Sequence, residues 1–228
     1  MLEPQYDSIK ILPKTPQQLS LIWLHGKGKG GQEFEGIFSE LDLPEHCGVH
    51  FIFPVDSVSD TIGKSLSLGW YGIKHISLTE EFDFEGIHRS SKIITRIIEN
   101  EVDRGIQTNN IFLAGFGQGG VLALYTALTL DSDLGGVLGL SSYLPSLDKL
   151  GIAIGDDYAT TPVFMGHGAW DAAVPLRVGK QTYRGLKSLG YPVRWHEYSI
   201  GHEICTQEMK DLSQFIKKTI QSRQLDHE

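Results

Sequence analysis

The stretch Ile111–Gly120, IFLAGFGQGG, constrains the fold more than any other part of this chain. It opens with β-branched and aromatic residues, as buried strands do, and passes through glycines into VLALYTALTL, which predicts a helix. A strand, a sharp glycine-rich turn and a helix are the setting of the nucleophile elbow, whose pattern is G-x-S-x-G. We therefore interpret this stretch as an elbow of that kind.

The serine position of the pattern holds Gly117, in the frame Gly115-Phe116-Gly117-Gln118-Gly119. The tip of an elbow has a strained backbone that lifts its side chain above the sheet. Because glycine adopts positive φ without strain, the fold is expected to survive a glycine there. Serine-type hydrolysis is not expected to survive it, since the attacking hydroxyl is missing. A tight strand–helix turn without any chemistry is the alternative interpretation.

The composition fits one α/β domain that spans residues 1–228. A net charge of −8 argues against nucleic acid as the main partner, because binding phosphates needs a basic surface. No apolar run is long enough for a transmembrane helix, and the N-terminal residues lack the basic and apolar regions of a signal peptide. Two cysteines, Cys47 and Cys205, provide no disulfide framework. We therefore expect a cytoplasmic protein.

Apolar runs and periodic segments alternate along the chain. Strands are predicted at 6–12, 19–25, 49–53, 111–114, 135–141, 162–167 and 193–198. Helices are predicted at 32–41, 84–104, 121–130, 175–189 and 203–220. Because strands alternate with helices, we expect a mostly parallel central sheet with helices on both faces.

Residues 55–82 are the least regular part of the sequence and contain the segment SLSLGWYGI. Long loops with apolar side chains often cover a functional site. We therefore interpret 55–82 as a loop that covers the substrate, with Leu66, Leu68, Trp70 and Tyr71 as substrate-binding residues. Plain packing of this loop over the core is an equally good interpretation.

Four predicted strand ends carry residues suited to catalysis, and active sites in open parallel sheets lie at the carboxyl ends of the strands. These ends carry the glycine loop of residues 25–31, the elbow, Asp171 and His202. The order elbow, acid, histidine is that of an α/β-hydrolase triad. His202 is the predicted general base, and Asp171 is predicted to orient its imidazole. The backbone amides of Lys27 and Gln118 are the predicted oxyanion-hole donors.

Two further histidines, His25 and His167, flank the predicted site, and we expect them to orient loops. No spacing typical of metal ligands occurs, since His202-Glu203 lacks the second histidine of an HExxH motif. We therefore predict neither a metal nor a cofactor.

Taken together, these motifs resemble those of the bacterial carboxylesterase and acyl-protein thioesterase family, also called phospholipase/carboxylesterases, over about residues 20–220. LAGFGQGG resembles the family's LAGFSQGG elbow, and IWLHG resembles its oxyanion loop. HGAWDAAVP is similar to its HGxxDxxVP acid loop and GHEICTQE to its HSxCxxE segment, which point to Asp171 and His202. LGWYGI is similar to its RAWYDI substrate loop. The resemblance implies an α/β-hydrolase fold and a Ser–Asp–His triad that hydrolyses acyl esters or thioesters.

The sequence departs from the family pattern at three places. Gly117 stands at the position of the nucleophilic serine, Gly72 stands where the family usually has aspartate, and HGKGKGGQEF replaces the usual HGLGxxGxDF form. The first departure predicts that this exact chain is inactive or nearly so, whether the glycine is engineered or a natural loss. The other two departures concern substrate preference.

Three functional hypotheses follow. The first is a serine esterase or thioesterase scaffold for an acylated lipid or protein, with transient membrane-surface contact and a homodimer left open. The second is a pseudoenzyme that binds acyl ligands or acylated proteins without catalysis. The third is a nucleotide-binding protein, since residues 26–31 and 115–120 each fit G-x-G-x-x-G. Neither following strand ends in the acid that would hold a ribose, which disfavours the third hypothesis.

Overall fold

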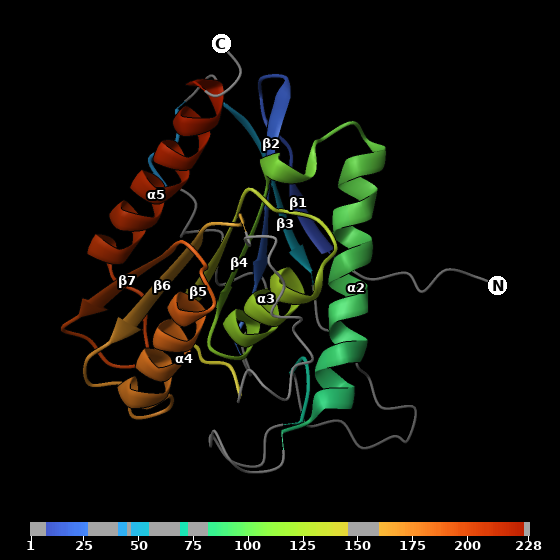
Figure 1. Cartoon of the computed structure of the whole chain (residues 1–228). Coiled ribbons are helices and arrows are strands. Elements are labelled where there is room, and N and C mark those ends of the chain that lie inside the picture. Colours follow the sequence, from blue (N-terminus) through green and yellow to red (C-terminus); the bar gives the residue numbers. More distant parts are fainter. Residues whose placement is uncertain are drawn as a thin grey trace.

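The computed structural model describes residues 8–26, 41–44, 47–54, 69–72, 82–145 and 160–225. Within these ranges seven strands form one sheet in the order β1-β3-β2-β4-β5-β6-β7. The strands are β1 (Ser8–Ile11), β2 (Gln17–Leu24), β3 (Gly48–Pro54), β4 (Ile111–Phe116), β5 (Gly136–Leu140), β6 (Val163–Gly168) and β7 (Val193–Tyr198). β1 runs antiparallel to β3, and every other neighbouring pair is parallel. The predicted mostly parallel sheet is confirmed (Figure 1).

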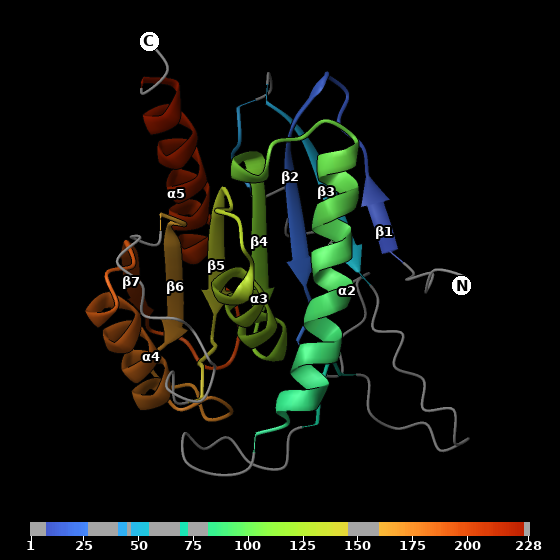
Figure 2. The same ribbon diagram turned by 45° about the vertical axis from the view of Figure 1, so that its right-hand side comes forward.

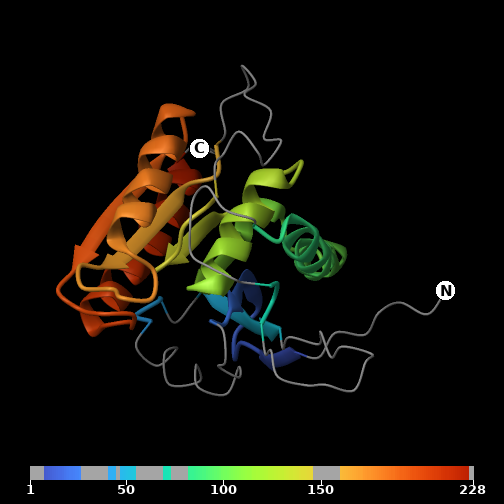
Figure 3. The ribbon, with the colours of Figure 1, turned by 90° about the horizontal axis from the view of Figure 1, so that it is seen from below.

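Helices cover both faces of this sheet. In the described ranges they are α2 (Phe84–Asp103), the short 3-10 helix η2 (Thr108–Asn110), α3 (Gln118–Thr129), α4 (Leu176–Ser188) and α5 (Thr206–Leu225). Helices α2, α3 and α4 contribute to the hydrophobic cluster on one face, and α5 contributes to the cluster on the other (Figure 2). Seen from below, α4, α3 and α2 follow one another across the sheet (Figure 3). The prediction of helices on both faces is confirmed.

Strand β2 shows why a near-continuous apolar run is needed inside such a sheet. Successive side chains of a strand point to opposite faces. Accordingly, Ile22 and Leu24 belong to the cluster with α2, α3 and α4, whereas Leu19, Leu21 and Trp23 belong to the cluster with α5. The sequence of a strand covered on both faces is therefore apolar throughout and does not alternate between apolar and polar residues.

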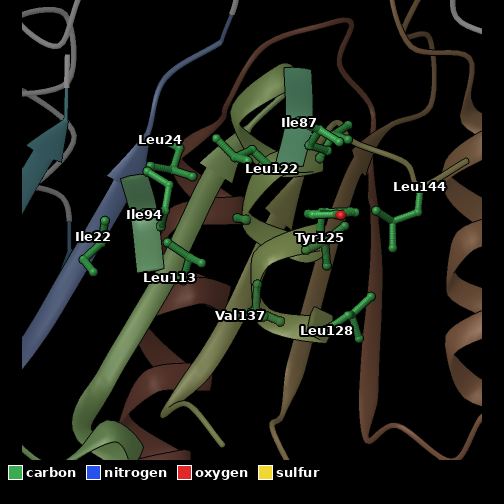
Figure 4. Packing of buried hydrophobic residues seen from close by; sticks show 14 of the residues in the cluster. Ile22, Leu24, Ile87, Ile94, Leu113, Leu122, Tyr125, Leu128, Val137 and Leu144 are labelled. Carbon is green, nitrogen blue, oxygen red and sulfur yellow. The ribbon is translucent and has the colours of Figure 1, made fainter. Parts of the chain in front are cut away.

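Helix α3 is buried along nearly its whole length. Every residue from Gln118 to Leu128 is buried, because the helix lies on β4 and β5 between its neighbours α2 and α4. Leu122 and Leu128 of this helix pack in one cluster with Ile94 of α2 and Val137 of β5 (Figure 4). A helix surrounded in this way is apolar on all sides, which is why its sequence shows little helical periodicity.

Two helices end where the sequence predicts. Gly105 follows the end of α2 and Gly190 follows the end of α4, with φ of 95° and 87°. A left-handed residue after the last turn is the ordinary way to end a helix, and glycine adopts it without strain. Each predicted strand overlaps an observed one.

The last helix differs from its prediction. The predicted range 203–220 becomes Thr206–Leu225, because the residues before Thr206 form the turn that carries His202. The first bond of the helical turn joins the Met209 N–H to the Cys205 carbonyl at 3.1 Å. Residues 32–40 of the helix predicted at 32–41, and most of the predicted cover loop, lie outside the described residues, and Leu41 is not helical. In the described part, no helix is both long and apolar enough to cross a membrane.

Candidate active site

The elbow lies where β4 ends and α3 begins. Its tip, Gly117, has φ 55° and ψ −117°, a conformation that side-chain-bearing residues rarely adopt. The Gly117 N–H donates to the Leu140 carbonyl at 2.8 Å, and the Gly117 carbonyl accepts the Val121 N–H at 3.1 Å. The tip is therefore fixed by β5 on one side and by α3 on the other. This geometry agrees with the predicted strand–turn–helix.

The glycines around the tip allow a close approach of three elements. A Cβ on Gly115 would lie 2.3 Å from the Gly119 carbonyl oxygen, and a Cβ on Gly119 would lie 2.2 Å from the Leu24 carbonyl oxygen. Any side chain at these two positions would push α3 away from β2 and β4. Packing therefore requires this glycine frame whatever chemistry occurs at the tip.

The predicted acid and histidine meet at this edge of the sheet. Asp171 lies in the turn after β6 and His202 in the turn after β7, with His202 Nδ1 2.8 Å from Asp171 Oδ2. The second carboxylate oxygen, Oδ1, accepts the N–H groups of Ala173 at 2.9 Å and Val174 at 2.7 Å. The carboxylate is buried, whereas the imidazole keeps 30% of its side chain exposed. A carboxylate held this firmly can orient the imidazole beside it.

The imidazole of His202 faces the elbow tip. A Cβ built on Gly117 would lie 3.2 Å from His202 Nε2 and 3.4 Å from its Cε1. The ring of Phe116 packs against the imidazole, with centroids 4.5 Å apart. The structure thus brings the three predicted catalytic positions together, with the predicted base facing Gly117 at the predicted nucleophile position.

The two flanking histidines have contacts that fit the expected orienting role. His167 is buried, and its Nε2 is 2.9 Å from the Val174 carbonyl in the acid loop. Burial lowers the pKa of His167, which favours a neutral hydrogen-bond donor there. His25 follows β2, with Nδ1 2.9 Å from the Gly26 carbonyl, and its ring packs on Trp70 at a centroid distance of 4.9 Å.

The side chain of Gln118 ties a distant segment to the elbow. Its Oε1 accepts the Trp70 N–H at 3.2 Å, and its Nε2 donates to the Tyr71 carbonyl at 2.5 Å. The Trp70 indole N–H donates to the His25 carbonyl at 2.9 Å, and the Ser90 hydroxyl donates to the Trp70 carbonyl. Residues 69–72 are therefore fixed between α2, the elbow and the end of β2.

Some predicted ligand-contact residues can be placed and others cannot. Trp70 and Tyr71 are 3% and 6% exposed and belong to the cluster beneath α2 and α3. In this conformation they are packing residues, and their contact with a substrate stays a prediction. Lys27, Leu66 and Leu68 lie outside the described residues. The amide of Gln118 is at the first turn of α3, where a helix leaves its N–H groups without intrahelical partners.

Sequence reasoning missed two features of this site. It named Gln118 for its backbone amide and not for its side chain, although a long amide beside an elbow can bond two backbone groups at once. It also gave no role to Ser141, which is buried next to Leu140 and has φ 44°. No local pattern signals that strain. Among the described residues, no group of three or more His, Cys, Asp or Glu side chains could hold a metal ion.

A mostly parallel sheet, a glycine-rich elbow and an acid–histidine pair on two following strands define the α/β-hydrolase class. The comparisons with known proteins specify this further. The chain belongs to the phospholipase/carboxylesterase family, whose model matches residues 7–220.

Individual relatives support the same assignment. Acyl-protein thioesterase 1 of Gibberella zeae is 33% identical over 222 residues, which cover 92% of this chain and 94% of that protein. The crystal structure of SOBER1 from Arabidopsis thaliana gives a TM-score of 0.81 at 25% identity, over 89% of this chain and 99% of that one. The crystal structure of acyl-protein thioesterase 2 of Zea mays shares the fold, with a TM-score of 0.79 at 22% identity over 93% and 98% of the two chains.

These similarities confirm the predicted family and the α/β-hydrolase fold, and the family acts on acylated substrates. They favour the hydrolase hypothesis over the nucleotide-binding hypothesis. The sequence also resembles the bacterial members of this family in particular, and that part of the resemblance stays a prediction.

Proposed function

We propose that this chain is a carboxylesterase and acyl-protein thioesterase scaffold that retains the base and acid of a Ser–Asp–His triad. With Gly117 at the nucleophile position, this exact chain is inactive or nearly so compared with a serine enzyme. The observation that carries the proposal is the position of His202, whose Nε2 lies 3.2 Å from a Cβ placed on Gly117. That is where a base must lie to take a proton from a hydroxyl at this residue.

The reaction of a serine at residue 117 follows from this geometry. The hydroxyl oxygen would attack the acyl carbon while His202 takes its proton, and Asp171 would stabilise the imidazolium. The proposed oxyanion-hole donors are the backbone amides of Lys27 and Gln118, the second supported by its place at the N-terminus of α3. Water would then hydrolyse the acyl-enzyme. Without the hydroxyl, no acyl-enzyme forms on residue 117.

The proposed substrates are acyl esters or thioesters carried by a lipid or by an acylated protein in the cytoplasm. The acyl chain is proposed to contact the segment around residues 66–71, with Leu66, Leu68, Trp70 and Tyr71. Support comes from Gln118, a residue of the elbow helix whose side chain hydrogen-bonds to the backbone of Trp70 and Tyr71. Transient contact with a membrane surface would fit a lipid substrate.

A second candidate function is a pseudoenzyme that binds an acyl ligand or an acylated protein and does not turn it over. The glycine at the tip favours it, because φ 55° and ψ −117° suit glycine better than any residue with a side chain. Gly72, in place of the family's usual aspartate, favours it as well.

Three measurements on the parent chain and two variants test the proposal. Calorimetric titration with a medium-chain fatty acid tests acyl binding, and Trp70→Phe tests by tryptophan fluorescence whether that residue senses the ligand. A serine-directed fluorophosphonate should label Gly117→Ser and leave the parent chain unlabelled. Absence of fatty-acid binding would contradict acyl recognition, and labelling of the parent would mean that another nucleophile serves this site.

A further inference from the structure

The space between Gly117 and the His202 imidazole can hold a small molecule, because glycine has no side chain to fill it. Apart from the chain neighbours Phe116 and Gln118, the described residues provide only the Nε2 and Cε1 atoms of His202 within 4 Å of a Cβ placed on Gly117. Glycine therefore leaves room for a small group that can hydrogen-bond to Nε2. A bonded water oxygen lies roughly 2.7–3.0 Å from its nitrogen partner, which fits this space.

The proton on His202 is placed by its partner. The Asp171 carboxylate can only accept, and its Oδ2 is 2.8 Å from Nδ1, so Nδ1 carries the hydrogen. The lone pair of the neutral imidazole is then on Nε2 and points toward Gly117. The Phe116 ring packs against the imidazole and limits its rotation. The geometry thus supplies an oriented base above a glycine.

From this we infer that the parent chain hydrolyses acyl esters and thioesters by direct attack of a water held between Gly117 and His202 Nε2. The inference rests on the proposed function, because it uses the same acyl site. It replaces the two-step acyl transfer of a serine enzyme with a single displacement and no covalent intermediate.

The step balances with water as the only co-reactant. The water oxygen forms the bond to the acyl carbon, its proton passes to Nε2, and the carbonyl electron pair moves to the oxygen near the Gln118 amide. The carbonyl then reforms, the bond from the acyl carbon to sulfur or ester oxygen breaks, and the leaving group takes the proton back from Nε2. The products are a carboxylic acid and a thiol or alcohol.

The decisive variants are Gly117→Ala and Gly117→Ser, which place the same Cβ at the same φ and therefore carry the same backbone strain. The alanine methyl would lie 3.2 Å from Nε2 and displace the water without supplying a hydroxyl. The assay is release of thiol from an octanoyl thioester and of p-nitrophenol from p-nitrophenyl octanoate. Each preparation is assayed before and after treatment with a fluorophosphonate, which inactivates any serine esterase carried over from the host.

The parent is expected to keep its rate after phosphonate treatment, to show no pre-steady-state burst, and to exceed His202→Ala by roughly 10²-fold, the scale of general-base catalysis. Gly117→Ala should fall to the level of His202→Ala, while Gly117→Ser should become faster and phosphonate-sensitive. Circular dichroism and thermal melts confirm that each variant is folded.

Three results would overturn the inference: a parent rate equal to that of folded His202→Ala, an unchanged rate in Gly117→Ala, or loss of the parent rate to phosphonate. Fatty-acid binding measured alongside keeps the two proposals separate. A parent that binds the acid and does not hydrolyse the esters contradicts only the water mechanism, whereas a parent that does neither contradicts the proposed function as well.

Discussion

The side chain of Gln118 reaches from the first turn of α3 to the Tyr71 carbonyl, with Nε2 and the carbonyl oxygen 2.5 Å apart. The same side chain accepts the Trp70 N–H. One residue of the elbow therefore holds a segment that is 47 positions away in the sequence.

We predict that Gln118→Met, which keeps the length of the side chain and removes both polar atoms, destabilises the protein by about 1–3 kcal/mol. The reason is that the buried Trp70 N–H and Tyr71 carbonyl lose their partner. Urea unfolding followed by tryptophan fluorescence measures the effect. Gln107→Met, at an exposed position, is the matched control. An equal loss in the two variants would contradict the role of Gln118.

A second prediction concerns a polar cluster buried between the sheet and α2. Burial by itself raises the pKa of Glu101, but hydrogen bonds from His50, Ser20 and Gln17 outweigh it and hold the pKa at about 2. Because the unfolded value is near 4.5, the stability from this group is fully present above about pH 4.5 and is lost as pH falls toward 2.

Glu101→Gln removes the charge that this cluster is built around. We expect it to be less stable than the parent at pH 7 by a few kcal/mol, with the difference shrinking between about pH 4.5 and pH 2. Chemical denaturation across this pH range provides the measurement. Glu99→Gln, an exposed neighbour on the same helix, should change stability little at any pH. A pH-independent difference between parent and Glu101→Gln would rule out the proposed linkage.

The pKa of Glu208 is shifted in the opposite direction from that of Glu101. It is 1% exposed at the start of α5, and burial raises its pKa to about 8. A carboxyl whose pKa is raised on folding contributes stability that is fully present below about pH 4.5 and is lost as pH rises through 8. We predict that Glu208→Gln loses less stability than the parent between about pH 4.5 and pH 8, because the amide cannot ionise.

Melting temperatures of the parent and Glu208→Gln between pH 5 and pH 9 test the prediction, with exposed Glu203→Gln as the control. The parent should lose stability relative to Glu208→Gln as pH rises. Parallel curves for the two proteins would mean that Glu208 is ionised in the folded state throughout this range.

Much of this architecture could be predicted from sequence because the relevant signals are local. The run LSLIWL predicts a strand buried on both faces, and the glycine frame around Gly117 predicts the turn from β4 into α3. The predicted triad positions follow from strand ends, since the carboxyl ends of parallel strands meet at one edge. Accordingly, Asp171 Oδ2 and His202 Nδ1 lie 2.8 Å apart, although the two residues are 31 positions apart in the sequence.

Other features depend on contacts that no local pattern encodes. The amphipathic pattern of the last helix extends into residues 203–205. In the structure these residues belong to the turn that carries His202, and the helix begins at Thr206. The raised pKa of Glu208 comes from tight packing below β6, where a Cβ on Gly166 would lie 2.1 Å from its Oε1. The positive φ of Ser141, the residue after Leu140, likewise has no signal in the local sequence.

The central claim is that this site has the full machinery of a serine hydrolase except for one hydroxyl, and kcat/KM of Gly117→Ser tests it most directly. Serine at φ 55° costs on the order of 1–3 kcal/mol of stability, which a folded domain of this size can tolerate. We predict at least a 10²-fold gain in kcat/KM over the parent on an octanoyl ester or thioester. The gain should be lost in Gly117→Ser/His202→Ala and strongly reduced in Gly117→Ser/Asp171→Asn. Folded Gly117→Ser protein that is no faster than the parent across short and long acyl chains would contradict the claim.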